Sequence, residues 1–258
     1  MNRKPIPALR LISLIGLVLV AAGCSGHSTA SDTSGPTGAA DSPSGPELST
    51  VLFLGDSVAA GEALPLAPAF EASDVGFESI ASDGGGNVVG PFADKNWEKL
   101  PGQITSAEPD VVVYQITTYD WGSRTEQRDA YDRLLSTVTD AGARLVFVTS
   151  PPIKPDDFYR PHMGELERAP EAARTVADSS EKAVLLDAGA VWGDTYQQVT
   201  DGKAYRSADG IHTCPQGAAR FTEWLLGELA KRYSGFTPAD AQEWANTGWS
   251  ADEHFTGC

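Results

Sequence analysis

The 258-residue sequence is poor in metal-binding side chains and in basic residues. It contains three cysteines, four histidines and two methionines, and 19 lysines and arginines stand against 35 aspartates and glutamates. His27, His162 and His254 lack ligand-like neighbours, so no metal site is predicted. The formal charge of −16 repels nucleic acids and anionic membrane surfaces, and we expect neither as a direct partner.

Signals for cofactors and membrane spans are also missing. Gly84-Gly85-Gly86 lacks the Gly-Lys-Ser/Thr ending of a phosphate loop and the Gly-x-Gly-x-x-Gly spacing of a dinucleotide site, so no cofactor is predicted. The apolar run Leu11–Val20 is too short for a comfortable membrane span.

The amino terminus has the layout of an export signal. Residues 1–10 carry three positive charges and no negative ones, the next ten are almost wholly apolar, and small residues lead to Cys24. This order resembles a bacterial lipobox, in which Cys24 becomes the lipidated first residue of the mature protein, although Ala21 replaces the usual large aliphatic residue. Plain secretion with cleavage elsewhere is the alternative.

We therefore expect residues 1–23 to be a signal peptide and residues 24–49 a lipidated, flexible tether rich in Ser, Thr, Gly, Ala, Pro and Asp. The protein would be anchored through Cys24 to the outer face of the cell membrane. In that oxidising compartment Cys214 and Cys258 are a candidate disulfide, with two free thiols as the alternative.

From residue 50 onward, short apolar runs alternate with helix-like segments. The apolar runs are Val51–Leu54, Phe77–Ala81, Val111–Ile116, Leu145–Thr149 and Val184–Leu186. They are mostly unbroken, as strands buried on both faces should be, and the segments between them have apolar residues at helical spacing. This alternation predicts a mainly parallel five-stranded sheet flanked by helices in residues 50–234. Residues 235–258 are expected to pack on that domain as a tail.

Ser57 stands where the first apolar run meets its helix, in Gly55-Asp56-Ser57. Ligands of open parallel sheets bind beyond the carboxyl ends of the strands, and a helix N-terminus favours negative charge. Ala59 departs from the Gly-x-Ser-x-Gly elbow of α/β-hydrolases. An ordinary helix-capping serine is the alternative to a nucleophile.

Asp209-Gly210-Ile211-His212 places a carboxylate three residues before an imidazole. In a turn that leads into a helix, the carboxylate can accept from one ring nitrogen and leave the other free to take a proton from a serine. A structural histidine that caps a loop is the alternative.

Gly-Asp-Ser near the start and Asp-x-x-His near the end together resemble the SGNH (or GDSL) hydrolase family, from residue 51 to about residue 233. The resemblance implies a three-layer α/β/α fold of flavodoxin-like type. It implies Ser57 as nucleophile, Asp209 as orienting carboxylate and His212 as base. It also implies an oxyanion hole formed by the Ser57 amide and a glycine among residues 84–86.

The third motif departs from the family pattern. Where the family commonly has Gly-x-Asn-Asp, this chain has Thr117-Thr118-Tyr119-Asp120, so an oxyanion donor worth about 3 kcal/mol is missing. SGNH domains of membrane acyltransferases that O-acylate envelope polysaccharides often have an aromatic residue here, and Asn87 after the glycines is similar to that subset. We expect Tyr119, Trp121 and Asn87 to bind substrate, and Trp97 to join an aromatic cluster that stacks on a sugar. Core filling by these rings is the alternative.

The resulting prediction is a serine esterase or acyltransferase that acts on O-acyl groups of envelope glycans or glycolipids through an acyl-serine intermediate. A membrane acyltransferase is a further partner that the resemblance suggests. The main alternative is a catalytically weak glycan-binding lipoprotein, which the missing asparagine favours and the intact Ser57, Asp209 and His212 oppose. A lipase for long acyl chains also stays open.

Overall fold

The computed structural model describes residues 47–258. The predicted signal peptide, Cys24 and the tether as far as residue 46 lie outside the described residues. Leu48 is buried in the core, so the folded part includes positions that the sequence assigned to the tether. Within the described part, no helix combines the length and the hydropathy needed to cross a membrane.

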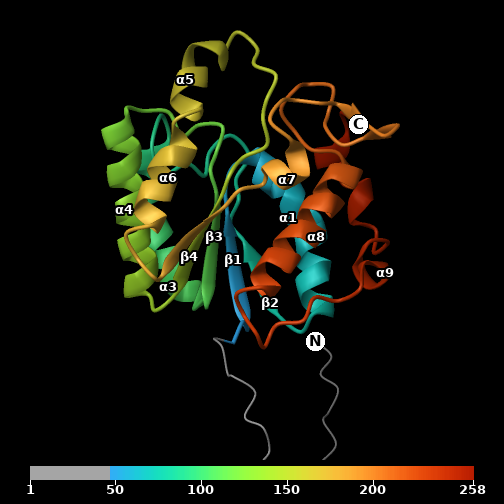
Figure 1. The fold of residues 1–258 in the computed structure, drawn as a ribbon, viewed down its shortest axis with the longest axis horizontal. Coiled ribbons are helices and arrows are strands. Elements are labelled where there is room, and N and C mark those ends of the chain that lie inside the picture. Colours follow the sequence, from blue (N-terminus) through green and yellow to red (C-terminus); the bar gives the residue numbers. More distant parts are fainter. Residues whose placement is uncertain (1–46) are drawn as a thin grey trace, which may run out of the picture. The chain divides into compact units, whose positions relative to one another are not determined.

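Five parallel strands form one sheet in the order β2-β1-β3-β4-β5 (Figure 1). The strands are β1 (Thr50–Leu54), β2 (Gly76–Ser79), β3 (Val111–Gln115), β4 (Arg144–Val148) and β5 (Ala183–Leu186). The three inner strands are buried along almost their whole length, whereas the edge strands are more exposed. The predicted fold class is confirmed, and the strand order is flavodoxin-like.

Helices cover both faces of the sheet (Figure 1). One face carries α1 (Ser57–Ala72), α7 (Gly189–Trp192), α8 (Pro215–Ala230) and α9 (Ala241–Trp244). The other carries α2 (Ala93–Trp97), α3 (Leu100–Ala107), α4 (Arg124–Asp140) and α6 (Ala169–Ala177). The short η1 (Arg160–His162) and α5 (Met163–Leu166) belong to the β4–α6 connection, at the end of the sheet where the strands finish.

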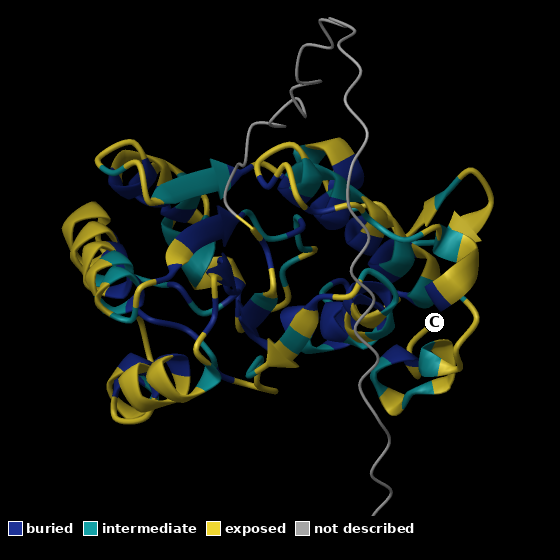
Figure 2. Cartoon of the chain, turned by 90° about the horizontal axis from the view of Figure 1, so that it is seen from below, coloured by how far each residue is buried: buried dark blue, intermediate teal, exposed yellow. Residues whose placement is uncertain are grey.

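Alternate residues of each inner strand point into two separate cores, as the period of a strand requires. Phe53 packs against Phe221 of α8, with 6.4 Å between ring centroids. On the other face, Tyr114 and Phe147 pack against Tyr131 of α4. Viewed from below, the buried segments lie inside a rim of exposed helix faces (Figure 2). Both layers therefore hold the strands, and the loops that follow them are presented at one edge.

The C-terminal tail packs beside α1 and contains α9, η2 (Trp249–Ala251) and η3 (Glu253–Phe255). Trp244 and Phe255 are buried, so the tail contributes to the hydrophobic interior. A disulfide joins Cys214 to Cys258, with 5.6 Å between the Cα atoms. The predicted pair is thus bonded, and it attaches the end of the chain to the start of α8. A small antiparallel hairpin of β6 (Val199–Thr200) and β7 (Lys203–Ala204) precedes this region.

Candidate active site

Asp56 links the end of β1 to the turn that follows β3. It is the N-cap of α1, and its carboxylate accepts hydrogen bonds from the Val58 N–H at 3.0 Å and from the Thr118 N–H and hydroxyl, both at 2.7 Å. Burial raises the pKa of Asp56, and these hydrogen bonds oppose the rise. Ser57 consequently begins α1 at the point between β1 and β3 where the strand order reverses, the usual ligand site of such sheets.

A chain of two hydrogen bonds joins Asp209, His212 and Ser57. Nε2 of His212 lies 2.9 Å from Oγ of Ser57, and Nδ1 lies 2.8 Å from Oδ2 of Asp209. The other oxygen of Asp209 accepts from the N–H groups of Ile211, at 2.7 Å, and His212, at 3.0 Å. The structure therefore brings together the three side chains that the sequence predicted, although 155 positions separate Ser57 from His212.

The electrostatics of this chain favour one tautomer of the imidazole. Burial raises the pKa of Asp209, but the bonds from the His212 ring and from the two backbone N–H groups outweigh it and lower the pKa to about 2. Asp209 is thus a carboxylate at neutral pH and accepts the proton on Nδ1. Nε2 then presents its lone pair to the Ser57 hydroxyl, as a general base must.

Arg206 is a residue of this region that sequence reasoning missed. Arg206 is 2% exposed, and its guanidinium donates to the carbonyls of Ile211, His212 and Pro152, the last at 2.7 Å. Burial lowers the pKa of Arg206 to about 10, and the carboxylate of Glu62 in α1 opposes that shift. The guanidinium of Arg206 thus connects the turn of residues 209–212, here called the histidine turn, to the segment after β4. Its only sequence signal is an arginine three residues before Asp209.

The glycine loop approaches the nucleophile through Gly86. This residue has φ +78°, and a Cβ there would lie 1.9 Å from the carbonyl oxygen of Gly55, so only glycine fits. Gly84 has open space around it, and the nearest atoms to Gly85 belong to Ser82 and Asn96. Among the three predicted glycines, Gly86 is therefore the one that packs beside the turn bearing Ser57.

The Thr117–Asp120 turn is held by a buried carboxylate. Asp120 accepts hydrogen bonds from the hydroxyls of Tyr114 and Tyr131, each at 2.8 Å, and from the Thr117 N–H and hydroxyl. Burial raises the pKa of Asp120 to about 6, against the effect of these bonds. The turn is therefore rigid, and it fixes the backbone from which Tyr119 projects.

Two of the three predicted substrate-binding residues belong to an aromatic cluster next to this turn. The Tyr119 ring centroid lies 5.8 Å from that of Trp121, 5.4 Å from Phe92 and 6.3 Å from Phe158. Both Tyr119 and Trp121 are partly exposed, so they are not simply core. Phe92 and Phe158 were not singled out in the sequence, because neither follows a predicted strand directly.

Trp97 and Asn87 do not occupy the positions expected of them. Trp97 is buried in the core, donates its Nε1–H to the Val88 carbonyl at 2.8 Å and packs under Arg133. Asn87 is fully buried, and its amide donates to the Val89 carbonyl at 2.7 Å. Trp97 fills the interior and Asn87 braces the glycine loop, so the expectation that they contact a sugar is corrected.

Across residues 47–258, no three His, Cys, Asp or Glu side chains gather in a group that could hold a metal ion. The site consists of a serine, an imidazole, a carboxylate and backbone N–H groups. Such a set is suited to nucleophilic acyl transfer, in which a hydroxyl attacks a carbonyl carbon.

Comparison with solved structures places this fold among esterases and an acetyltransferase domain. An acetyl-xylooligosaccharide esterase from Geobacillus stearothermophilus is similar with a TM-score of 0.51 and 12% identity, over 72% of this chain and 96% of that chain. A carbohydrate esterase of family 3 from Talaromyces cellulolyticus is similar with a TM-score of 0.53 and 16% identity, over 74% and 100%.

The periplasmic domain of a lipopolysaccharide acetyltransferase from Salmonella Paratyphi A is similar with a TM-score of 0.53 and 14% identity, over 73% of this chain and 86% of that domain. The sequence matches no protein-family model and no curated protein. At these identities the comparisons establish a shared fold, a parallel sheet between two layers of helices.

Proposed function

We propose that this protein is a serine esterase or acyltransferase that acts on O-acyl groups of cell-envelope glycans or glycolipids. The observation that carries the proposal is the hydrogen-bond chain from Asp209 through His212 to Ser57. The solved neighbours support it, because their names describe an acetyl-xylooligosaccharide esterase, a carbohydrate esterase and a lipopolysaccharide acetyltransferase domain.

In the first half of the reaction, Oγ of Ser57 forms a bond to the acyl carbon and His212 Nε2 takes the hydroxyl proton. The backbone N–H groups of Ser57 and Gly86 are the proposed donors to the oxyanion, since Ser57 begins α1 after β1 and Gly86, in the loop after β2, packs against Gly55 of the same turn. The bond from the acyl carbon to the sugar oxygen then breaks, and His212 returns the proton to that oxygen. Ser57 is left as an acyl ester.

In the second half, water or a sugar hydroxyl gives its proton to His212 Nε2 while its oxygen bonds to the acyl carbon. The ester bond to Ser57 breaks, and Oγ recovers the proton. Asp209 stays ionised throughout and stabilises the imidazolium that forms in each half. Hydrolysis and transfer differ only in the acceptor of the acyl group.

For the location of the protein, we propose export and a lipid anchor at Cys24 on the outer face of the cell membrane. The basic, apolar and small-residue segments before Cys24 support this part of the proposal. A disulfide between Cys214 and Cys258 is compatible with an oxidising compartment. A membrane acyltransferase is a proposed partner that would supply or accept acyl groups.

A second candidate is a glycan-binding lipoprotein with weak catalysis. The observation in its favour is Tyr119, whose side chain lies in an aromatic cluster at the position where the family commonly has an oxyanion-donating asparagine. The two candidates differ in whether Ser57 is a reactive nucleophile.

A fluorophosphonate probe distinguishes the two candidates, because it labels a serine that a neighbouring base activates. We expect labelling of the wild-type protein, and of Ser150→Ala, a matched control at the same edge of the sheet whose hydroxyl donates to the Ile116 carbonyl. Ser57→Ala should not be labelled. A wild-type protein that resists the probe would overturn the enzymatic proposal in favour of the binding module.

A further inference from the structure

Large apolar side chains are seldom exposed in residues 47–258. In the part of the chain that the structure describes, three are exposed: Phe92 at 40%, Phe158 at 53% and Val199 at 56%. Val199 belongs to the small hairpin, whereas Phe92 and Phe158 both contact Tyr119. Two of the three exposed apolar side chains thus meet at one place, and such a concentration marks a binding surface.

The two phenylalanines reach this place from different loops, and each loop is held there. Gly90 has φ +92°, and a Cβ at this position would lie 2.3 Å from the Tyr119 carbonyl oxygen. This close approach brings Phe92 to Tyr119, with 5.4 Å between ring centroids and 68° between planes. The glycine therefore serves to bring the Phe92 loop against the Tyr119 turn.

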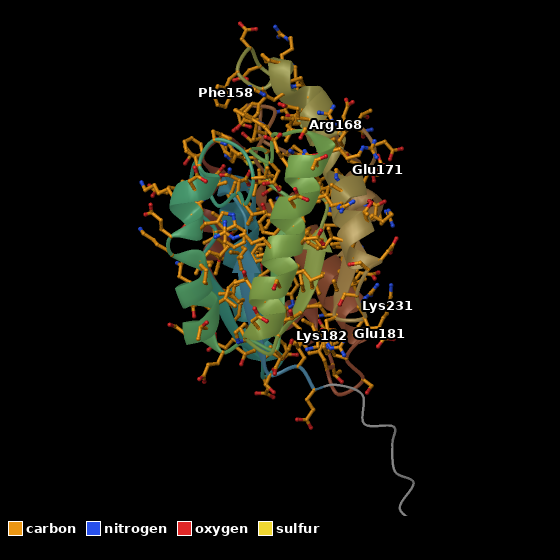
Figure 3. All side chains as sticks on the ribbon, turned by 90° about the vertical axis from the view of Figure 1, so that its left-hand side faces the viewer. Phe158, Arg168, Glu171, Glu181, Lys182 and Lys231 are labelled. Carbon is orange, nitrogen blue, oxygen red and sulfur yellow. A yellow bond between two sulfur atoms is a disulfide. The ribbon has the colours of Figure 1, made fainter. Side chains whose placement is uncertain are left out.

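Phe158 is exposed on a rigid loop. Its N–H and that of Tyr159 both donate to Asp156 Oδ1 at 3.0 Å, and the buried Tyr159 lies 3.4 Å from the Thr118 hydroxyl, oxygen to oxygen. Figure 3 shows Phe158 on the loop that rises beyond one end of the sheet, with Glu181 and Lys182 at the other end. The hydrogen bonds to Asp156 therefore fix the backbone in a conformation that leaves the Phe158 ring exposed.

This aromatic ledge, defined as Phe92, Tyr119 and Phe158, adjoins the nucleophile. Thr118 precedes Tyr119 and donates two hydrogen bonds to Asp56, the residue before Ser57. Trp121 packs beside the ledge: its Nε1–H donates to the Thr118 carbonyl at 2.9 Å, and its ring stacks on His162 at 3.6 Å. A group bonded to an ester at Ser57 would consequently lie next to the turn that bears Tyr119.

We propose that the aromatic ledge binds the sugar ring that carries the ester, and that Phe92 and Phe158 determine this specificity. The proposal rests on the function proposed above. A pyranose has an apolar C–H face that packs on aromatic rings and hydroxyls that point into water, which suits rings that are only half exposed. The excess of 35 acidic over 19 basic residues favours a neutral glycan over an anionic one.

An alkyl chain fits this ledge less well than a sugar does. The ledge is open to solvent and borders the carboxylates of Asp156 and Asp157, so an acyl chain lying there would stay hydrated. A cavity of about 320 Å³, lined in part by Ile153, Met163 and Leu166, is better suited to such a chain. The ledge and this cavity therefore differ in the ligand chemistry they suit.

The test compares Phe92→Ala and Phe158→Ala with Val199→Ala, a matched control that removes an exposed apolar side chain from the β6–β7 hairpin. The substrates are O-acetylated neutral oligosaccharides of glucose, galactose, mannose and xylose, with p-nitrophenyl acetate as an ester that has no sugar. We expect each phenylalanine variant to raise KM for the best sugar ester about tenfold with little change in kcat. The value of kcat/KM for that substrate, divided by the value for p-nitrophenyl acetate, should therefore fall about tenfold. Val199→Ala should keep the wild-type ratio.

Binding without chemistry separates this proposal from the enzymatic one. In the Ser57→Ala background, saturation-transfer NMR with the unacetylated oligosaccharides should detect contact that Phe158→Ala removes. If the wild type hydrolyses no ester but this contact is seen, the proposed enzymatic function is overturned, whereas the proposal that the ledge binds a sugar is supported. The proposal for the aromatic ledge is overturned if both phenylalanine variants keep the wild-type ratio and contact.

Discussion

The turns after β3 and before α8 each contain an aspartate at the carboxyl edge of the sheet, and the two aspartates differ in almost every physical property. The Asp209 side chain is 43% exposed, binds an imidazole and has a pKa lowered to about 2. Asp120 is fully buried, accepts from two tyrosine hydroxyls and has a pKa raised to about 6 by burial. One carboxylate binds an imidazole, and the other holds a turn.

This difference shows how exposure and partner type assign roles to identical side chains. Asp209 and the imidazole of His212 are both within reach of solvent. Asp120 has neutral partners that donate without exchanging protons, so its contribution is rigidity. The two turns should therefore fail in different ways: changes in the histidine turn should affect rate, and changes around Asp120 should affect stability.

Removal of the base should have the largest effect. We expect His212→Ala to lower kcat/KM for p-nitrophenyl acetate by on the order of 10⁴-fold or more, because serine and base act as one unit. Asp209→Ala should be milder, since Asp209 orients the base without reacting. Unfolding curves of both variants should match the wild type closely. A His212→Ala variant with a tenth of the wild-type rate would contradict the assignment of the base.

Removal of the disulfide should have the next largest effect. Reduction, or the pair Cys214→Ser with Cys258→Ser, should lower the free energy of unfolding by about 4 kcal/mol on the chain-entropy model of a long closed loop. The rate should fall as well, because Cys214 lies two residues after His212. Dithiothreitol added to the double-serine variant is the control and should change nothing. Equal melting temperatures before and after reduction would show that the disulfide contributes no stability.

Asp120→Ala should affect mainly stability. It leaves the hydroxyls of Tyr114 and Tyr131 without their acceptor in the core, at a cost of about 3 kcal/mol in the free energy of unfolding. Tyr131→Phe removes one of these bonds and should cost less. Urea titrations measure both, and the kcat of the folded Asp120→Ala protein should stay within a few-fold of wild type. A variant that is stable but inactive would assign Asp120 to the chemistry instead.

The raised pKa of Asp120 also predicts a pH dependence. The folded protein binds this proton more tightly than the unfolded chain does, in which aspartate titrates near 4. The contribution of Asp120 to stability should therefore fall as the pH rises from about 4 to about 6. Asp120→Asn should lack this slope in urea titrations at successive pH values, and an unchanged slope would place the titration elsewhere.

Arg206→Lys should have the smallest effect of the series. Lysine keeps the charge but offers donors from a single point, so it cannot hold three carbonyls in a fixed geometry. We expect kcat to fall about tenfold with KM little changed, because a displaced base costs rate more than binding. Arg206→Met should lower kcat further, since it also removes the positive charge that lowers the pKa of Glu62. Equal losses in KM and kcat would indicate a general collapse of the site.

Local patterns in the chain determined the fold class and half of the site. Unbroken apolar runs such as those of β1, β3 and β4 indicate strands buried on both faces, because each residue must suit one of two cores. Asp209 and His212 lie three residues apart, so their pairing is a property of a single turn. Ser57 could be placed because a strand followed directly by a helix exposes the first helical residue.

Only the tertiary structure determined which loops meet. Thr118 binds Asp56 across 62 positions, and Arg206 reaches Pro152 across 54, through contacts that depend on strand order and loop path. The same limit explains the corrections for Trp97 and Asn87. A tryptophan or asparagine near a sheet edge can turn inward or outward, and the backbone acceptors that turn these two inward, Val88 and Val89, exist only once the loop has folded.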